Sequence, residues 1–381
     1  SVTSADRETA RQSMDELVEL ARASGIVPAD VIIQRLRDVN ARTLIGKGKL
    51  SEIVLRALQC GVDLLIFDQD LNPSQVKAIT DTTELRVIDR TQLILDIFAQ
   101  RAQSREGKIQ VEMAQLKYLL PRLGVKDDAL SRLTGGIGTR GPGETTLEIN
   151  RRRTKDRIAH LERQLDMVRK NRGQRRSRRT RRELPIISIV GYTNAGKSTL
   201  LNTLTHSEVF VQDKLFATLD PSSRRLRFPE DREVIVTDTV GFIRDLPRDL
   251  MEAFAATLEE LDDADLLLHL VDVSNPRFEE QMTAVRRILE QLELDRKPTL
   301  LVFNKADLVE PFILEQHLRR HGAIAISALS SGTLGPLLAA MQREVRGIPS
   351  GPGLPVACEV GPMLRVLGEE KVEELEIAPP A

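Results

Sequence analysis

The sequence predicts an α/β protein whose largest domain is a mostly parallel sheet with helices on both faces. Three observations lead to this prediction. Short apolar segments alternate with helical patterns over residues 1–100 and again over residues 185–345, as they do in parallel sheets. The pattern between these stretches is wholly helical. The second stretch begins with an apolar segment, a glycine-rich turn and a helical pattern in direct succession, which is the order of a phosphate-binding loop.

The composition is typical of a globular chain with several domains. The 381 residues are 41% hydrophobic and 29% charged, which suffices for two to three cores. No apolar run approaches the ~20 residues of a membrane span, and the first residues do not have the pattern of a signal peptide. Cys60 and Cys358 stand alone, which excludes a disulfide framework or a cysteine zinc cluster and fits a reducing cytosol. We therefore expect a monomeric, cytoplasmic protein without a membrane span.

Residues 1–104 are expected to form an N-terminal α/β subdomain. Leu17, Leu20 and Ala21 fall on one face of a first helix. Turn residues separate the apolar segments that follow, so that strands and helices alternate. We predict strands at residues 43–45, 64–67 and 86–88, and helices at residues 50–58, 73–79 and 93–102.

Residues 105–183 are expected to form a basic helical hairpin. Apolar residues make one stripe over residues 113–120 and a second over residues 147–168. Two such helices joined by a loop bury their stripes against each other as an antiparallel pair. A glycine-rich loop at residues 135–143 joins them, and the arginine-rich run at residues 169–182 is expected to be a connector.

This hairpin carries a concentrated positive charge. Residues 101–182 contain 23 Lys or Arg and 9 Asp or Glu, a net charge of +14, whereas the whole chain has −1. A basic block in an otherwise acidic chain predicts an anionic partner, most often nucleic acid. The candidates for RNA contact lie in the glycine-rich loop and the arginine run: Arg140, Gly141, Gly143, Arg175, Arg176, Arg178 and Arg179.

The phosphate-binding loop follows an expected strand at residues 186–190. Its glycines let backbone N–H groups curl around phosphate oxygens, and the helix that begins near Thr199 adds partial positive charge. Lys197 is expected to reach the β- and γ-phosphates, and the Ser198 hydroxyl to bind Mg²⁺. The loop reads Gly191, Tyr192, Thr193, Asn194, Ala195, Gly196, Lys197 and Ser198.

A second motif ends the expected strand at residues 234–237. Asp238 is placed to hold the magnesium ion, and the N–H of Gly241 to sense the γ-phosphate. Together with Lys197, Gly241 is expected to take part in catalysis. A D-x-x-G sequence is weak evidence alone, but it is strong evidence at the end of a buried strand that follows a phosphate-binding loop.

A third motif selects the base. Asn304, Lys305 and Asp307 follow an expected strand, and the Asp307 carboxylate can accept two hydrogen bonds from guanine that adenine does not offer. Ser327 and Ala328 are expected to close the base pocket. The sequence thus predicts GTP and GDP as ligands of a P-loop GTPase domain. This domain is expected over residues 184–348, followed by a short C-terminal tail or hairpin at residues 349–381.

The segment that covers the nucleotide must lie between the phosphate-binding helix and residue 234. Phe216, Ala217 and Thr218 are the best candidates, with Thr218 completing the Mg²⁺ coordination and contributing to catalysis. The alternative is a purely structural role for Thr218. The residue after Gly241 is Phe242, where GTPases of the Ras kind place a glutamine that orients water.

Because an aromatic ring cannot orient water, another group must do so. Asn194 suggests one answer, since some GTPases that lack the glutamine use such an asparagine to hold K⁺ near the phosphates. The alternative is a local hydrogen bond within the loop.

These motifs together resemble the HflX family of translation-associated GTPases, over about residues 10–347. The resemblance rests on residues 44–49, 87–91, 94–99, 135–145, 216–220 and 238–243. It implies a factor that binds the large ribosomal subunit and its rRNA and, with GTP, splits stalled or stress-arrested ribosomes. The glycine-rich loop would then reach into rRNA near the peptidyl-transferase centre. Two departures are an absent strand before the first helix and a shorter C-terminal region.

Other functions remain open. A ribosome-assembly or RNA-remodelling GTPase would carry the same basic block, whereas a signalling switch without nucleic acid would not need it. The resemblance also raises ATP binding by the N-terminal subdomain. The glycines and lysines at residues 46–49 lack the spacing of a phosphate-binding loop, so RNA binding or a structural use is the alternative.

Overall fold

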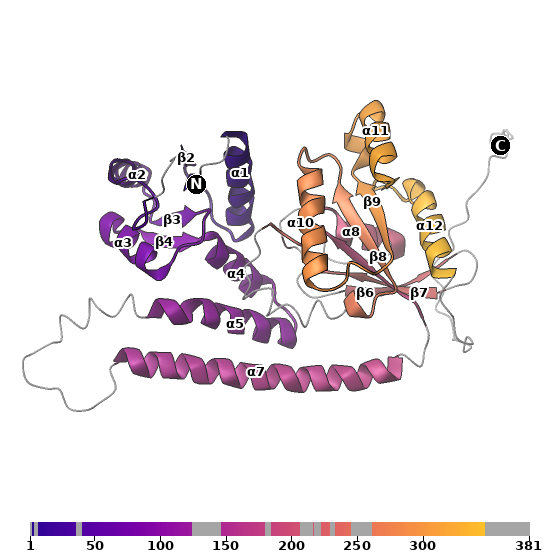
Figure 1. Ribbon diagram of the computed structural model, residues 1–381, viewed down its shortest axis with the longest axis horizontal. Helices are drawn as coiled ribbons and strands as arrows, with labels where there is room; N and C mark the ends of the chain where they lie inside the picture. Colours follow the sequence, from indigo (N-terminus) through magenta and orange to yellow (C-terminus); the bar gives the residue numbers. More distant parts are fainter. Residues whose placement is uncertain are drawn as a thin grey trace, which may run out of the picture. The chain divides into compact units, whose positions relative to one another are not determined.

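The structure is a computed structural model (Figure 1). The described residues all belong to one compact unit of the chain. No helix in the described part of the chain has the length and apolar character needed to cross a membrane. The structure describes residues 2–3, 7–35, 40–123, 146–179, 184–205, 216, 222–228, 233–244 and 261–346.

The N-terminal subdomain alternates helices and short parallel strands. Helix α1 spans Arg7–Ala23, and its residues Leu17, Leu20 and Ala21 are all buried, as predicted. Strand β3 (Leu64–Phe67) pairs in parallel with β4 (Arg86–Asp89). The predicted strands at residues 64–67 and 86–88 and all three predicted helices are confirmed. The helices are α2 (Lys47–Cys60), α3 (Pro73–Thr83) and α4 (Arg90–Arg101).

Two expectations for this subdomain are wrong. Residues 43–45 are a turn rather than a strand, because the Asn40 side chain accepts hydrogen bonds from the N–H groups of Arg42 and Thr43. The strand thought absent before the first helix is present: β1 (Val2–Thr3) pairs in parallel with β2 (Gln34–Arg35). Its two residues are too few to give a recognisable periodicity.

The two helices expected for the hairpin are present, whereas the glycine-rich loop lies outside the described residues. Helix α5 (Arg105–Leu119) ends in the 3-10 turn η1 (Leu120–Arg122), and α7 (Thr146–Arg179) runs back alongside it in the opposite direction (Figure 1). Ile109, Met113, Leu161 and Leu165 are buried in a common core. The arginine run was expected to be a connector, but residues 169–179 belong to α7, since arginine is a good helix former.

The C-terminal sheet has six strands in the order β10-β9-β8-β5-β7-β6. All pairs are parallel except β6 with β7. The chain passes from β5 to β7 on one side and later to β8 on the other, so β5 is the point where the strand order reverses. Ligands bind at such points in open α/β sheets. The strands are β5 (Ile186–Gly191), β6 (Ser222–Arg227), β7 (Glu233–Asp238), β8 (Leu266–Asp272), β9 (Thr299–Asn304) and β10 (Ile324–Ala325).

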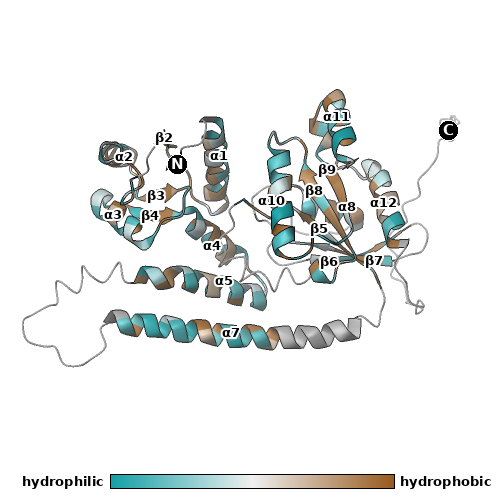
Figure 2. Cartoon of the chain, in the orientation of Figure 1, coloured by the Kyte–Doolittle hydropathy of each residue, from teal (hydrophilic) through white to brown (hydrophobic). Residues whose placement is uncertain are grey.

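Helices cover both faces of this sheet. Alternate residues of a strand point to opposite faces, and in β5 Ile187 and Ile189 join the core beneath α8 (Lys197–Thr205) and α12 (Gly335–Arg346), whereas Val190 joins the core beneath α10 (Phe278–Gln291). Helix α11 (Pro311–His321) packs Leu314 and Leu318 against a smaller core shared with α10. Figure 2 shows the hydrophobic strands between these helices.

Candidate nucleotide-binding site

The phosphate-binding loop leaves the C-terminal end of the central strand β5 and runs into α8. It needs Gly196, whose φ is +91°, because a Cβ there would lie 2.3 Å from the amide nitrogen of Asn304. Asn194 is exposed at the loop, with a φ of +62°. Thr199 lies partly buried in the first turn of α8. The strand, loop and helix predicted from the sequence are therefore all present.

Lys197 lies inside the loop with 6% of its surface exposed. Its ammonium group donates hydrogen bonds to the carbonyls of Tyr192 at 2.9 Å and Gly191 at 3.3 Å. Burial lowers the pKa of Lys197 to about 8, although the Asp238 carboxylate acts in the opposite direction. A phosphate beside this amine would favour its charged form.

The two predicted magnesium ligands that the structure describes lie together. The Ser198 hydroxyl donates a 2.6 Å hydrogen bond to a carboxylate oxygen of Asp238, and both side chains are buried. Two hard oxygen ligands at the start of a phosphate-binding helix fit Mg²⁺, which prefers few protein ligands and completes its shell with water and phosphate. Ser198 and Asp238 would hold the ion, which supplies positive charge at the phosphates when bound.

Gly241 lies against the phosphate-binding loop. A Cβ at Gly241 would lie 2.9 Å from the Thr193 Cα and 3.0 Å from the Lys197 Nζ, so only glycine fits. The next residue binds the loop through its backbone: Phe242 accepts from the Thr193 N–H at 2.7 Å and donates to the Gly191 carbonyl at 3.1 Å. The Phe242 ring is 3% exposed within the core. An apolar ring in that position cannot orient a water molecule.

The base motif is held by Asn304 at the end of β9. Its amide donates to the Ala195 carbonyl at 2.8 Å, and its side-chain carbonyl accepts from the Ala328 N–H at 2.8 Å. Asn304 thus joins the phosphate-binding loop to the predicted base pocket. Ser327 is buried beside Ala328, and its N–H donates to the Thr333 hydroxyl at 3.0 Å.

Lys305 is held by an ion pair, and Asp307 lies exposed on a short turn. Lys305 has a φ of +59° and forms a 2.7 Å ion pair with Asp272, the last residue of β8. Asp307 is exposed in the short 3-10 turn η3 (Ala306–Leu308), which leaves its carboxylate accessible to a base. Asp272 is a contributor that sequence reasoning missed, because a lone aspartate at a strand end carries no distinctive signal.

Several predicted residues are not tested by the structure. Ala217 and Thr218 lie outside the described residues, as do Arg140, Gly141 and Gly143, so their roles stay predictions. Arg175, Arg176, Arg178 and Arg179 lie within α7, but their side chains are not described. Phe216 is described: its N–H donates to the Thr193 hydroxyl at 2.8 Å, and its ring packs on Phe98 of α4, 4.6 Å between centroids.

Sequence reasoning also missed a polar cluster around Tyr192. The Tyr192 hydroxyl bonds to Glu16 of α1 and accepts from the N–H of Arg244. Glu16 forms a 3.0 Å ion pair with Arg90, and Arg244 donates to the Ser13 hydroxyl at 2.7 Å. These residues are far apart in sequence, so no local pattern predicts the contact between the phosphate-binding loop and the N-terminal subdomain.

Three family models match the chain in order. The GTP-binding GTPase N-terminal model matches residues 11–99, and the GTP-binding GTPase Middle Region model matches residues 101–179. The model described as a 50S ribosome-binding GTPase matches residues 186–305. The crystal structure of SsGBP in complex with GDP has 26% sequence identity and a TM-score of 0.51, and covers 89% of this chain and 97% of that one.

Curated relatives extend over most of the chain. The GTPase HflX of Caldanaerobacter subterraneus subsp. tengcongensis is 48% identical over 334 residues, which cover 88% of this chain and 77% of that protein. The GTPase HflX of Escherichia coli is 42% identical over 339 residues, which cover 88% and 80%. With the phosphate-binding, magnesium and base motifs assembled at one edge of a parallel sheet, these similarities establish that the chain belongs to the HflX family and is a P-loop GTPase.

Proposed function

We propose that this GTPase binds the large ribosomal subunit through its basic hairpin and uses GTP to separate the subunits of stalled ribosomes. The observation that carries the proposal is the charge of α7. Its 34 residues contain 13 Lys or Arg and 4 Asp or Glu, and the coloured part of the helix in Figure 2 is mainly hydrophilic. A helix of this length spans about 50 Å, which suits a row of RNA phosphates.

The match to a model described as a 50S ribosome-binding GTPase supports the choice of partner. The position of α7 supports a link to the nucleotide, since the helix ends at Arg179 and β5 begins at Ile186. The N-terminal subdomain contacts the same region: Phe98 packs on Phe216, and Glu16 binds Tyr192. The loss of the γ-phosphate would therefore affect both the GTPase domain and the N-terminal subdomain, which flank the hairpin in sequence.

The experiment is subunit separation by purified protein. We expect 70S ribosomes to separate when the protein and a non-hydrolysable GTP analogue are added, and to stay intact with GDP, as measured by light scattering and sucrose-gradient sedimentation. Sedimentation with isolated 50S subunits should give co-migration in the analogue state. Intact 70S ribosomes under saturating analogue and protein would contradict the proposal.

Arginine and glycine variants separate electrostatic attraction to RNA from the positioning of the loop on RNA. Replacing Arg175, Arg176, Arg178 and Arg179 with alanine should weaken ribosome binding broadly and flatten its salt dependence, because each neutralised phosphate adds about one unit to the log–log slope. Replacing Gly141 and Gly143 with bulky residues should leave the slope near normal while subunit separation is lost. If a folded glycine variant splits ribosomes at the normal rate, the loop serves only as a turn between the two helices.

Two other functions give different outcomes in the same assays. A ribosome-assembly or RNA-remodelling GTPase would prefer precursor particles over mature 50S subunits. A signalling switch would bind neither, and its activity would be insensitive to salt. The basic hairpin favours the RNA-binding functions over the switch.

We also propose that K⁺ assists hydrolysis at Asn194. The exposed position of Asn194 in the phosphate-binding loop and the burial of Phe242 support this role. GTP turnover should rise when K⁺ replaces Na⁺, and Asn194→Ala should abolish the rise without preventing GDP binding. Equal turnover in both salts would reject the K⁺ site and leave Asn194 as a local loop residue.

A further inference from the structure

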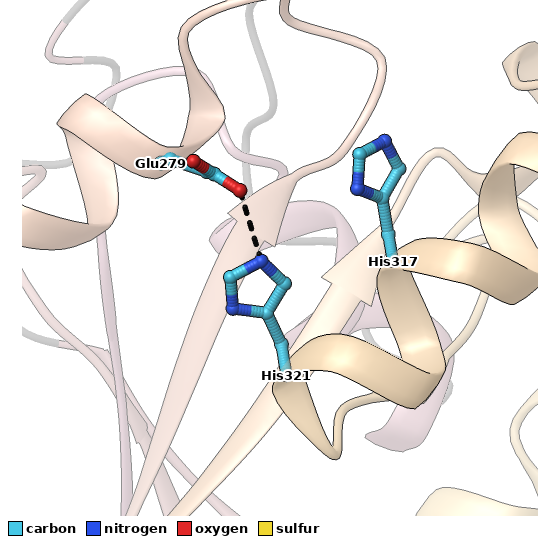
Figure 3. Close-up of side chains that lie close together, drawn as sticks. All are labelled: Glu279, His317 and His321. Carbon is cyan, nitrogen blue, oxygen red and sulfur yellow. Dashed lines mark hydrogen bonds and ion pairs between the residues drawn. The ribbon is translucent and has the colours of Figure 1, made fainter.

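A cluster of metal-ligating side chains lies where α10 meets α11, apart from the nucleotide motifs. Glu279 lies in the first turn of α10, and His317 and His321 lie four residues apart on α11. One ligand atom from each lies within 4.8 Å of the others, and Figure 3 shows the three side chains gathered between the two helices. We infer that they form a binding site for a transition-metal ion of the zinc class.

The chemistry of the three ligands selects this class of metal. Two imidazole nitrogens and one carboxylate oxygen suit Zn²⁺, Co²⁺ or Ni²⁺, whereas Mg²⁺ and Ca²⁺ take oxygen ligands. Residues at i and i+4 lie on the same face of a helix, so His317 and His321 can bind one ion together. Three protein ligands leave a fourth tetrahedral position for water.

Aromatic packing holds both imidazoles in place. The Phe278 ring meets His317 edge to face, with 4.8 Å between centroids, and lies 5.9 Å from His321. The ring of Phe303 on β9 meets the His321 ring edge to face, with 5.8 Å between centroids. Rings fixed by packing lose little conformational freedom when they bind an ion, and this favours affinity.

The site needs only a small adjustment. Ligand atoms around tetrahedral zinc lie about 3.3 Å apart, and His321 Nε2 already lies 3.1 Å from a Glu279 oxygen. Arg320 also pairs with Glu279 at 3.0 Å, but its side chain is 68% exposed and is free to turn into solvent. The ion would then take the place of the guanidinium as the positive partner of Glu279.

The position of the site gives it a structural role in the GTPase domain. It joins the start of α10 to the end of α11, and both helices pack on Phe303. The residue after Phe303 is Asn304, which holds the base pocket to the phosphate-binding loop. None of the three ligands takes part in the nucleotide site, so metal and nucleotide can bind at the same time.

The test is metal binding by the full chain without an affinity tag, saturated with GDP and Mg²⁺ so that the nucleotide site is filled. We expect one equivalent of Co²⁺ to give the visible absorption of tetrahedral coordination and one equivalent of Zn²⁺ to displace it. His317→Ala should weaken Zn²⁺ binding by at least 30-fold in competition with a chromophoric chelator. The matched control is His160→Ala, which removes an exposed imidazole from α7.

His317 is the decisive variant because it leaves the hydrogen bond between His321 and Glu279 intact. If Glu279 and His321 served only as an ion pair, replacing His317 would not change the Zn²⁺ affinity of the chain. Glu279→Gln provides a second variant, since an amide is a poor metal ligand but keeps the shape of the side chain. Equal Zn²⁺ affinity in His317→Ala, His160→Ala and the unmodified chain would overturn the inference, as would the absence of saturable binding.

Discussion

The phenolic hydroxyl of Tyr192, in the phosphate-binding loop, donates a hydrogen bond to the carboxylate of Glu16 on helix α1. The same oxygen accepts a 2.9 Å hydrogen bond from the N–H of Arg244, three residues beyond Gly241. Burial, and then the charge of Glu16, raise the pKa of the Tyr192 hydroxyl, so it stays protonated as a donor. One hydroxyl therefore joins the nucleotide motifs to the N-terminal subdomain.

This contact predicts an energetic coupling between Tyr192 and Glu16. Tyr192→Phe should destabilise the chain by about 1–3 kcal/mol, because it removes the donor to a mostly buried carboxylate. In a double-mutant cycle with Glu16→Gln, the two effects should be non-additive by about 1 kcal/mol, measured by urea unfolding followed by circular dichroism. Tyr118→Phe, which loses a hydrogen bond to Asp89, serves as the control and should be additive with Glu16→Gln. Additive effects for Tyr192 would show that the contact carries no coupling.

Ser198, the proposed magnesium ligand, should be essential for turnover. Ser198→Ala removes a hydroxyl that lies 2.6 Å from Asp238, and GTP hydrolysis should fall by about 10²-fold or more because the ion that offsets phosphate charge is lost. Lys197→Ala should have a similar effect. Thr205→Ala on the same helix, whose hydroxyl donates to the Leu201 carbonyl, should keep near-normal turnover in the same phosphate-release assay. Normal turnover in Ser198→Ala would remove it from the metal site.

Asp307 should control which base is bound. Asp307→Asn replaces an acceptor pair with one acceptor and one donor, so guanine loses a hydrogen bond while xanthine, with a carbonyl at the same edge, gains one. We expect GDP affinity to fall by about 10²-fold and xanthosine diphosphate affinity to rise, as measured by equilibrium binding. Because Asp307 is exposed, the fold should be unaffected. Unchanged selectivity for guanine would sink the assignment of Asp307 as the base reader.

Nucleotide binding should take up protons at alkaline pH. Burial lowers the pKa of Lys197 to about 8, so the amine is partly neutral above this pH and returns to its charged form beside phosphate. Calorimetry of GDP binding in buffers of different ionisation enthalpy should give an uptake of a fraction of a proton at pH 9 and much less at pH 7.5. The same uptake at both values would contradict the role of Lys197.

His269 should make the GTPase domain sensitive to acid. Burial, with a smaller contribution from Arg286, lowers the pKa of His269 on β8 to about 4. The unfolded chain then binds more protons between about pH 4 and the ordinary value of 6.5, so stability rises with pH across this window and is lost as pH falls. In His269→Leu, the loss of unfolding free energy between neutral and acid pH should be smaller by roughly 3 kcal/mol. Urea unfolding at pH 7 and pH 4.5 measures this difference. An equal loss of stability at pH 4.5 in the unmodified chain and in His269→Leu would contradict the prediction.

The nucleotide motifs could be predicted from sequence because each is local. The phosphate-binding loop is eight consecutive residues between a strand and a helix. Asp238 and Asn304 each end a strand of the parallel sheet, β7 and β9, so the alternation of strands and helices places both at the same edge of the sheet. What Asn304 bonds to could not be predicted, because Ala195 lies 109 positions and Ala328 24 positions away. A separation of 176 positions likewise hid the contact between Tyr192 and Glu16.

The error at residues 43–45 arose where a side chain overrides local propensity. Thr43 and Ile45 are β-branched and favour a strand, but the Asn40 side chain accepts from the N–H groups of Arg42 and Thr43 and closes a turn there. The metal-ligating cluster left a partial signal, since His317 and His321 have the spacing of a helical metal site. The third residue, Glu279, is 38 positions away from His317, so no local pattern groups the three.

Asn304 and Asp307 lie three residues apart, but they differ in how well the fold should tolerate their substitution. Asn304 uses both ends of its amide inside the fold and has 2% of its surface exposed. Asp307 is exposed on a separate turn. We therefore expect that altering Asp307 alone exchanges the accepted base, whereas a change at Asn304 breaks the link between the phosphate-binding loop and the residues at Ala328. Ligand choice and scaffold integrity are thus separable by design within a single four-residue motif.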